Sequence, residues 1–213
     1  MPSASLRAAL ALTVAMPIAS CSFLSRNVPN THTYQLAPGT VAVLVPPEVR
    51  IELRTSAGTG PFEDEAIAYQ VSPYRLDTYQ FNRWVAAPSD LLRDRLREIL
   101  YQPSEVGPAQ PNAEPWQLDA RVQAFQEVDY DGRHSGVVAV QFCLYPSTPF
   151  SRAVWCKTES KENPASSGGI AGAVAAISLS FNQVMEQFAN DLSAEATRLA
   201  STADAKPPAP AQP

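Results

Sequence analysis

Short apolar and alternating segments follow one another between residues 34 and 71 and predict several β-strands. The continuous apolar run Val41–Val45 is typical of a central strand, whereas Val49–Arg54 alternates apolar and charged residues as a half-exposed strand does. Strand character returns at Glu65–Val71 after a predicted loop at Ser56–Pro61, and Tyr34–Leu36 predicts a further short strand. The first half of the chain is therefore expected to build a sheet.

The pattern changes to a helical period from Ser89 onward. Ser89 is expected to cap this helix by accepting a hydrogen bond from the backbone N–H of Leu92. The apolar positions share one face: Leu92, Leu96, Ile99 and Leu100. The opposite face carries acid–base pairs three residues apart, and we interpret it as a solvated surface: Asp90 with Arg93, and Asp94 with Arg97.

Three further strands are predicted at Trp116–Val128, Val137–Tyr145 and Arg152–Glu159. Asp131-Gly132 suits the tight turn of the first hairpin, and Pro146–Ser151 supplies the loop of the second. An antiparallel meander is the most economical arrangement of these segments.

The second hairpin brings two cysteines together if it pairs symmetrically about its loop, because Cys143 then faces Cys156. A disulfide is the favoured interpretation in a secreted chain, and two buried free thiols are the alternative. Either role is structural, because the pair lacks the C-x-x-C spacing of redox catalysts.

A long amphipathic helix is predicted from Ser166 or Ser167 to about Leu199. Its apolar positions recur with helical spacing: Ile170, Val174, Ile177, Phe181, Val184, Phe188 and Leu192. Its uncharged first half is short and rich in Gly, Ala and Ser, which argues against a membrane span. The predicted fold class is α+β, a two-layer sandwich of a mixed or mainly antiparallel sheet and two amphipathic helices.

The first residues have the organisation of a secretory signal: a positive start with Arg7, an apolar run at Ala8–Val14 and small residues after it. Ile18-Ala19-Ser20-Cys21 is similar to the lipobox of bacterial lipoproteins, which predicts cleavage between Ser20 and Cys21 and lipid attachment to Cys21. An ordinary cleaved signal with a chance cysteine is the alternative. The expected organisation is a signal peptide (1–20), a lipidated N-terminus and spacer (21–32), a domain (33–201) and a disordered Pro/Ala-rich tail (202–213).

Charge and composition narrow the classes of function. The chain carries 16 Lys and Arg against 21 Asp and Glu, a net charge of −5. Without a basic cluster it is a poor candidate for binding nucleic acid, and it has no electrostatic reason to lie on anionic lipid. Attachment to a membrane is therefore expected to come from acyl chains on Cys21.

The sequence contains no catalytic, cofactor-binding or metal-binding motif that we identify. The two histidines, His32 and His134, are too few for a histidine-rich metal site, and Ser135 points away from its strand neighbour His134. The carboxylates of Glu63, Asp64 and Glu65 leave a periplasmic hydrolase open as an alternative, although a solvated loop explains them more simply. A binding or scaffold protein without cofactors is favoured.

Aromatic residues, a tryptophan and a proline precede the first helix in an informative order: Tyr69-Gln70, Tyr79, Trp84, Pro88, and then Leu91, Leu92, Leu96 and Leu100. This order within Ile67–Leu100, together with the preceding lipobox and Tyr34-x-Leu36, resembles the ABC-type transport auxiliary lipoprotein family. The cysteine pair and the proline-rich tail are departures from the family pattern. These two departures put in doubt any detail of a partner interface that is transferred from the family to this chain.

The resemblance implies a non-enzymatic periplasmic lipoprotein that works with an MCE-domain lipid transporter and anchors the complex at the outer membrane. Ser22, rather than an aspartate, follows the lipidated cysteine and favours the outer over the inner membrane. A homo-oligomer is a further implication. The alternative is an outer-membrane lipoprotein that activates a cell-wall synthase or assists an outer-membrane barrel.

Five aromatic residues are candidates either for the core or for the contact with the MCE protein, and the sequence leaves the two roles open: Tyr69, Tyr74, Tyr79, Phe81 and Trp84.

Overall fold

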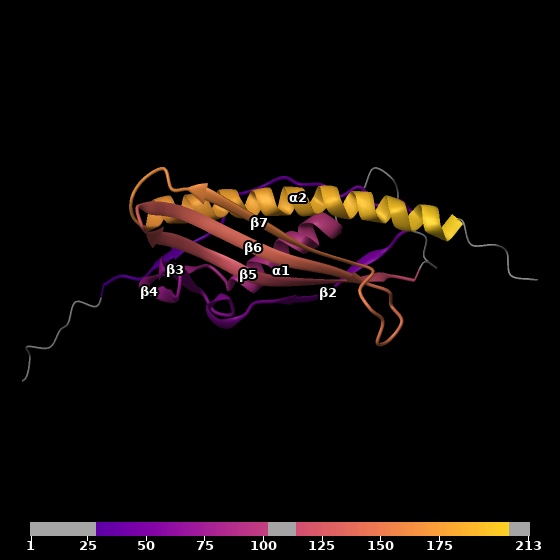
Figure 1. Cartoon of the computed structure of the whole chain (residues 1–213), viewed down its shortest axis with the longest axis horizontal. Helices are drawn as coiled ribbons and strands as arrows, with labels where there is room; N and C mark the ends of the chain where they lie inside the picture. Colours follow the sequence, from indigo (N-terminus) through magenta and orange to yellow (C-terminus); the bar gives the residue numbers. More distant parts are fainter. Residues whose placement is uncertain (1–28, 102–113, 205–213) are drawn as a thin grey trace, which may run out of the picture. The chain divides into compact units, whose positions relative to one another are not determined.

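The computed structural model describes residues 29–101 and 114–204, which form one mixed sheet and two α-helices (Figure 1). The elements are β1 (His32–Tyr34), β2 (Ile51–Ala57), the short 3₁₀ helix η1 (Gly60–Phe62), β3 (Ala66–Ser72), β4 (Arg75–Trp84), α1 (Pro88–Leu100), β5 (Trp116–Tyr130), β6 (Arg133–Tyr145), β7 (Trp155–Pro164) and α2 (Ile170–Asp204). The described strands pair in the order β1-β4-β3-β5-β6-β7, and β2 also pairs with β5. The predicted α+β class is confirmed.

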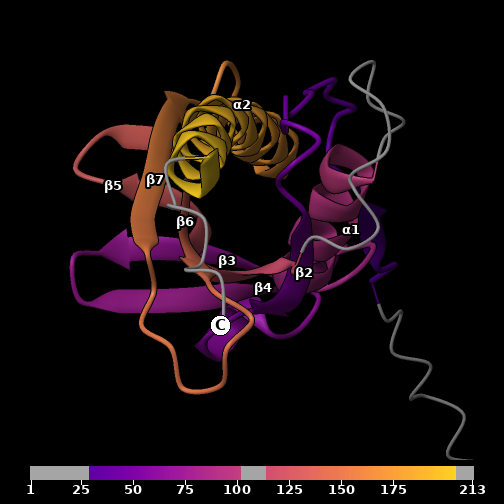
Figure 2. The ribbon, with the colours of Figure 1, turned by 90° about the vertical axis from the view of Figure 1, so that its right-hand side faces the viewer.

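Both helices contribute to one buried cluster with the sheet. α2 packs on β6 and β7, and α1 packs on β2, as the end-on view shows (Figure 2). Aromatic rings of α2 lie directly on the strands: Phe188 stacks on Phe142 with ring centroids 4.0 Å apart, and Phe181 meets Phe125 at 5.8 Å. None of the described helices is long and apolar enough to cross a membrane.

One edge of β5 is shared by two strands that run parallel to it. β2 pairs with the first part of β5, and β3 pairs with Gln126–Val128 near its end. η1 lies between the two strands and buries Phe62. The predicted loop Ser56–Pro61 is therefore wrong at its start, because Ser56 and Ala57 still pair with β5.

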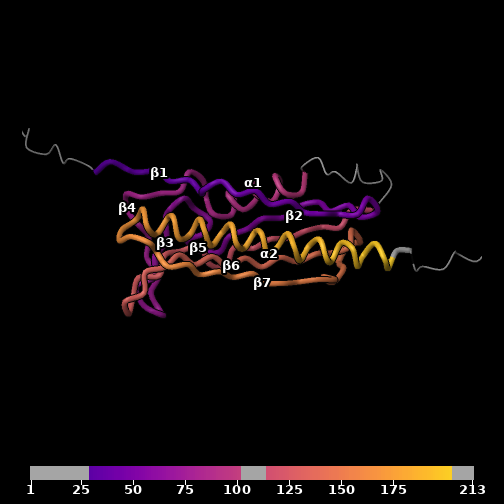
Figure 3. The backbone as a smooth tube through the Cα atoms, turned by 90° about the horizontal axis from the view of Figure 1, so that it is seen from above, coloured from indigo at the N-terminus to yellow at the C-terminus, as the bar shows by residue number. Residues whose placement is uncertain are grey.

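The apolar run Val41–Val45 is not a strand, which contradicts the sequence-based prediction. This segment lies next to the helices instead (Figure 3): the backbone N–H of Leu44 donates to Ser193 Oγ of α2 at 3.0 Å, and Arg95 of α1 donates to the Gly39 carbonyl. Val43 is buried while Leu44 is exposed. A hydroxyl of α2 thus satisfies one backbone N–H of a segment for which the apolar pattern predicted strand pairing.

Helix α1 begins one residue earlier than predicted. Pro88 occupies its first position and Ala87 is the N-cap residue, without a side-chain cap, so the expected cap by Ser89 is wrong. Proline suits this position because its fixed φ is already helical and its missing N–H has no partner to lose. The predicted apolar face is confirmed at three buried positions, Leu92, Leu96 and Ile99, whereas Leu100 is partly buried.

Strands β5, β6 and β7 form the predicted antiparallel meander. Asp131 and Gly132 have φ values of 53° and 74°, so the first turn is the tight type in which both central residues are left-handed. Cys143 pairs with Cys156 in the second hairpin and the two form a disulfide, with a Cα–Cα distance of 4.2 Å. β7 begins at Trp155 rather than at Arg152.

Helix α2 packs closely against β6 at Gly136. A Cβ atom at this residue would lie 2.2 Å from the backbone nitrogen of Ile177, so only a glycine fits without a shift. The Ser180 hydroxyl donates to the Gly136 carbonyl at 2.7 Å and fixes the approach. Small residues in the first half of α2 therefore allow helix and strand backbones to pack closely.

Candidate functional site

The predicted lipid-attachment site lies outside the described residues. Ser20, Cys21 and Ser22 precede Pro29, where the described chain begins. Cleavage before Cys21 and its lipidation stay predictions from the sequence, as do the domain boundaries.

The five candidate aromatic residues lie on one hairpin, formed by β3 and β4, which we call the aromatic hairpin (residues 66–84). The structure separates their surroundings. Trp84 is 1% exposed and meets Phe125 edge-on, with ring centroids 5.3 Å apart, so it belongs to the core. Tyr74 is 98% exposed at the tip of the hairpin, next to the exposed Leu76. Phe81 is half-buried on β4.

Tyr69 and Tyr79 are half-buried and contact each other, with ring centroids 4.5 Å apart. The Tyr79 hydroxyl donates to Glu127 Oε2 of β5 at 2.5 Å. Burial, followed by the hydrogen bond to Glu127, raises the pKa of Tyr79, and burial also raises the pKa of Glu127. The hydrogen bond between Tyr79 and Glu127 therefore ties β4 of the aromatic hairpin to β5.

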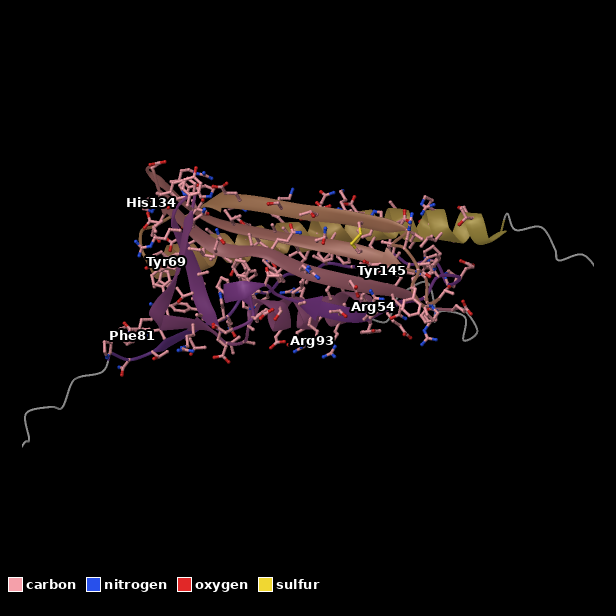
Figure 4. All side chains as sticks on the ribbon, turned by 60° about the horizontal axis from the view of Figure 1, so that its bottom comes forward. Arg54, Tyr69, Phe81, Arg93, His134 and Tyr145 are labelled. Atoms are coloured by element: carbon pink, nitrogen blue, oxygen red, sulfur yellow. A yellow bond between two sulfur atoms is a disulfide. The ribbon has the colours of Figure 1, made fainter. Side chains whose placement is uncertain are left out.

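Glu127 is the buried member of a polar cluster at the end of β5 and the start of β6. The two-residue turn places Asp129 opposite His134, and His134 Nδ1 lies 2.9 Å from Asp129 Oδ1. One donor atom each from Glu127, Asp129 and His134 all lie within 4.8 Å of one another, so these residues could hold a metal ion. We call Glu127, Asp129 and His134 the Glu127 cluster. Figure 4 shows His134 and Tyr69 at the same end of the sheet.

Sequence reasoning missed the Glu127 cluster although the necessary signal was present. Asp131-Gly132 was recognised as a tight turn, and symmetric pairing about it places Asp129 opposite His134, just as it places Cys143 opposite Cys156 in the next hairpin. Burial of Glu127 depends on the position of the aromatic hairpin, for which the sequence carries no comparable signal.

The residues considered for hydrolytic chemistry do not form a catalytic arrangement among themselves. The Ser135 hydroxyl donates to Glu162 at 2.6 Å, on the side of the strand away from His134. Glu63, Asp64 and Glu65 are exposed, and Asp64 accepts the backbone N–H of Ala66 at 2.7 Å, as a turn residue commonly does.

The opposite end of the sheet carries a second surface feature that the sequence did not indicate. The Arg54 guanidinium lies over the ring of Tyr145, 4.5 Å from its centroid, and also pairs with Asp119. Arg54 and Tyr145 line a pocket of about 450 Å³ together with the β6–β7 loop, in which Phe150 is fully exposed. Figure 4 shows Arg54 and Tyr145 far from His134.

The family model of the ABC-type transport auxiliary lipoprotein component matches residues 34–189, which include the aromatic hairpin, α1, the meander and the first part of α2. The chain belongs to this family. No curated protein matches the sequence.

Solved structures show the same fold. A crystal structure of a Xanthomonas campestris protein from the family model DUF330 superimposes with a TM-score of 0.67 at 18% identity, covering 80% of this chain and 99% of that one. A second crystal structure, of a protein described only as uncharacterized, has a TM-score of 0.53 at 15% identity and covers 78% of this chain and 99% of that chain. The family description thus identifies an auxiliary lipoprotein component of ABC-type transport.

Proposed function

We propose that this protein is a non-enzymatic component of an MCE-type lipid transport system and that it anchors the complex at the outer membrane. The observation that carries the proposal is the family match over residues 34–189, in a chain for which the sequence predicts a secretory signal and a lipobox. The transport role comes from the family, and the anchor comes from Cys21. Neither requires chemistry from the protein itself.

Acyl chains on Cys21 supply the anchor. Each buried CH₂ group contributes about 0.8 kcal/mol, so a cysteine that carries several chains stays in the membrane. The residue after Cys21 is Ser22, and not the aspartate that favours retention at the inner membrane. The outer membrane is therefore the proposed site, with the folded domain in the periplasm.

The tip of the aromatic hairpin is the proposed contact for the MCE-domain protein. Tyr74 is almost fully exposed and Leu76 is partly exposed, whereas Trp84 fixes the other end of β4 in the core. Tyrosine suits an interface because it buries a large ring while its hydroxyl keeps a polar partner. The hairpin thus presents an aromatic side chain on a base that is held in place.

Affinity purification of the detergent-solubilised, lipidated protein tests the proposal. Mass spectrometry is expected to identify an MCE-domain protein, with less of it recovered from Tyr74→Ser than from the wild type. Tyr101→Ser is the matched control, because Tyr101 is also an exposed tyrosine (58%) but lies at the end of α1. Recovery of a cell-wall synthase or an outer-membrane barrel without any MCE protein would overturn the proposal.

A further inference from the structure

Glu127 is a buried carboxylate without a lysine or arginine partner among the described residues. It is 4% exposed, and no described Lys or Arg forms an ion pair with it. A buried charge is costly unless it is paired or coordinates a metal. Tyr79 donates to one carboxylate oxygen only, Oε2. A bound cation would therefore compensate the charge of the Glu127 carboxylate, which no lysine or arginine of the described residues does.

We infer that the Glu127 cluster binds a divalent transition-metal ion, with zinc as the best fit, through one carboxylate oxygen each of Glu127 and Asp129 and one imidazole nitrogen of His134. The three donor atoms already lie within 4.8 Å of one another. Zn–N and Zn–O bonds of about 2.0–2.2 Å place neighbouring donors roughly 3–4 Å apart. Small rotations of the exposed Asp129 and His134 side chains are sufficient to reach this geometry.

The backbone holds these ligands close together before any ion arrives. Asp129 and His134 form a cross-strand pair directly before and after the two-residue turn, and Glu127 lies two residues earlier on the same strand face. Tyr79 orients Glu127 from β4, across the intervening strand β3, as a hydrogen-bond partner behind a metal ligand commonly does. The sheet thus fixes the positions from which the three side chains extend.

The donor set selects the class of metal. Two carboxylates and a neutral imidazole carry a charge of −2, which a divalent ion balances. Imidazole suits zinc, nickel, copper and iron, whereas magnesium and calcium prefer oxygen ligands alone. The side chains of Asp129 and His134 are about half exposed, which leaves a path for the ion and room for water as a further ligand.

A metal ion at this site would also stabilise the base of the aromatic hairpin. Glu127 holds the Tyr79 hydroxyl, and Tyr79 packs against Tyr69, so the ion and the hairpin share one partner. An ion that orders Glu127 therefore supports the base of the hairpin whose tip carries Tyr74. This consequence does not depend on which protein the tip contacts.

Calorimetric titration of zinc chloride into the untagged, lipidated protein in detergent, after treatment with a chelator, tests the inference. One zinc ion per chain is expected to bind and to raise the melting temperature. His134→Gln is expected to abolish binding, and Tyr79→Phe is expected to weaken it about 10-fold. His32→Gln is the matched control because it removes the other histidine of the chain, which lies on β1.

Binding that is equal in wild type and His134→Gln, or an equal affinity for magnesium, would overturn the inference, and so would the absence of zinc binding by the wild type. Circular dichroism of His134→Gln, Tyr79→Phe and His32→Gln verifies that each substitution leaves the fold intact. X-ray absorption of the zinc-loaded wild type gives a readout without substitution, and it is expected to show one nitrogen ligand of the imidazole type. Recovery of an MCE protein is measured separately, so the two proposals can fail independently.

Discussion

At the scale of single residues, Gly136 controls how closely α2 approaches the sheet. A Cβ atom there would lie 2.2 Å from the Ile177 nitrogen and 2.5 Å from the Ala176 carbonyl carbon, both of which belong to helix backbone. Backbone atoms cannot move aside as the end of a flexible side chain can. The packing of α2 on β6 is therefore sensitive to one methyl group.

Gly136→Ala is expected to destabilise the protein by about 1–3 kcal/mol, because it forces the helix away from the strand. Gly168→Ala is the control, since a Cβ atom at Gly168 meets nothing within 4 Å. The free energy of unfolding from urea titrations measures both variants. Equal stability of Gly136→Ala and wild type would contradict the packing described for α2.

Glu162 links stability to pH. The Ser135 hydroxyl, and after it the Arg133 guanidinium, hold the pKa of Glu162 below its ordinary value. Since the folded-state pKa is the lower one, this contribution is present above the unfolded-state pKa and is lost as the pH falls through the folded-state pKa. Ser135→Ala is expected to reduce the loss of stability between pH 7 and pH 3, measured by denaturant unfolding at each pH. A loss at least as large as that of the wild type would contradict this linkage.

At the scale of elements, the disulfide joins β6 to β7 across the loop that carries Phe150. Cross-linking two residues 13 positions apart restricts the unfolded chain. The double variant Cys143→Ser/Cys156→Ser is expected to lose about 2–4 kcal/mol of unfolding free energy, measured by denaturation. A wild-type mass that shows two free thiols after alkylation without reductant would contradict the bridge.

Hairpins with a clear turn were predictable in register as well as in type. Asp131-Gly132 and the cysteine pair each define a symmetric pairing, and both pairings are present. The period of α2 likewise predicted its buried face, including Ile177, Phe181 and Val184. These successes rest on local signals that the distant parts of the fold do not override.

Other elements depend on tertiary contacts that a pattern does not contain. The run Val41–Val45 is apolar, but its backbone bonds to the hydroxyl of Ser193 on α2 and forms no strand. The cap at Ser89 failed because Pro88 could start the helix one residue earlier.

The candidate site also combines features that local sequence signals predict with features that depend on tertiary contacts. The sequence brought five aromatic residues together, but only burial separates the core residue Trp84 from the exposed Tyr74. The Glu127 cluster combines a local pairing, Asp129 with His134, and a distant contact to Tyr79. Only the first of these could be deduced from the turn.

At the scale of the whole molecule, the predicted anchor at Cys21 is separate from the folded domain. The described core is built without Cys21, so Cys21→Ser is expected to leave the domain folded and release it into the soluble periplasmic fraction. Cell fractionation with immunoblotting measures the distribution, and circular dichroism verifies the fold. Persistent outer-membrane association of the folded variant would contradict the anchor, unless deletion of the MCE gene then releases it.

The most direct test of the central claim is photo-crosslinking in living cells from a photoreactive amino acid at position 74. The account predicts a cross-link to an MCE-domain protein from this position, and none from the control position 101, which is also an exposed tyrosine. Cross-linking at position 74 to a cell-wall synthase or an outer-membrane barrel, with no MCE-domain protein among the products, would contradict it.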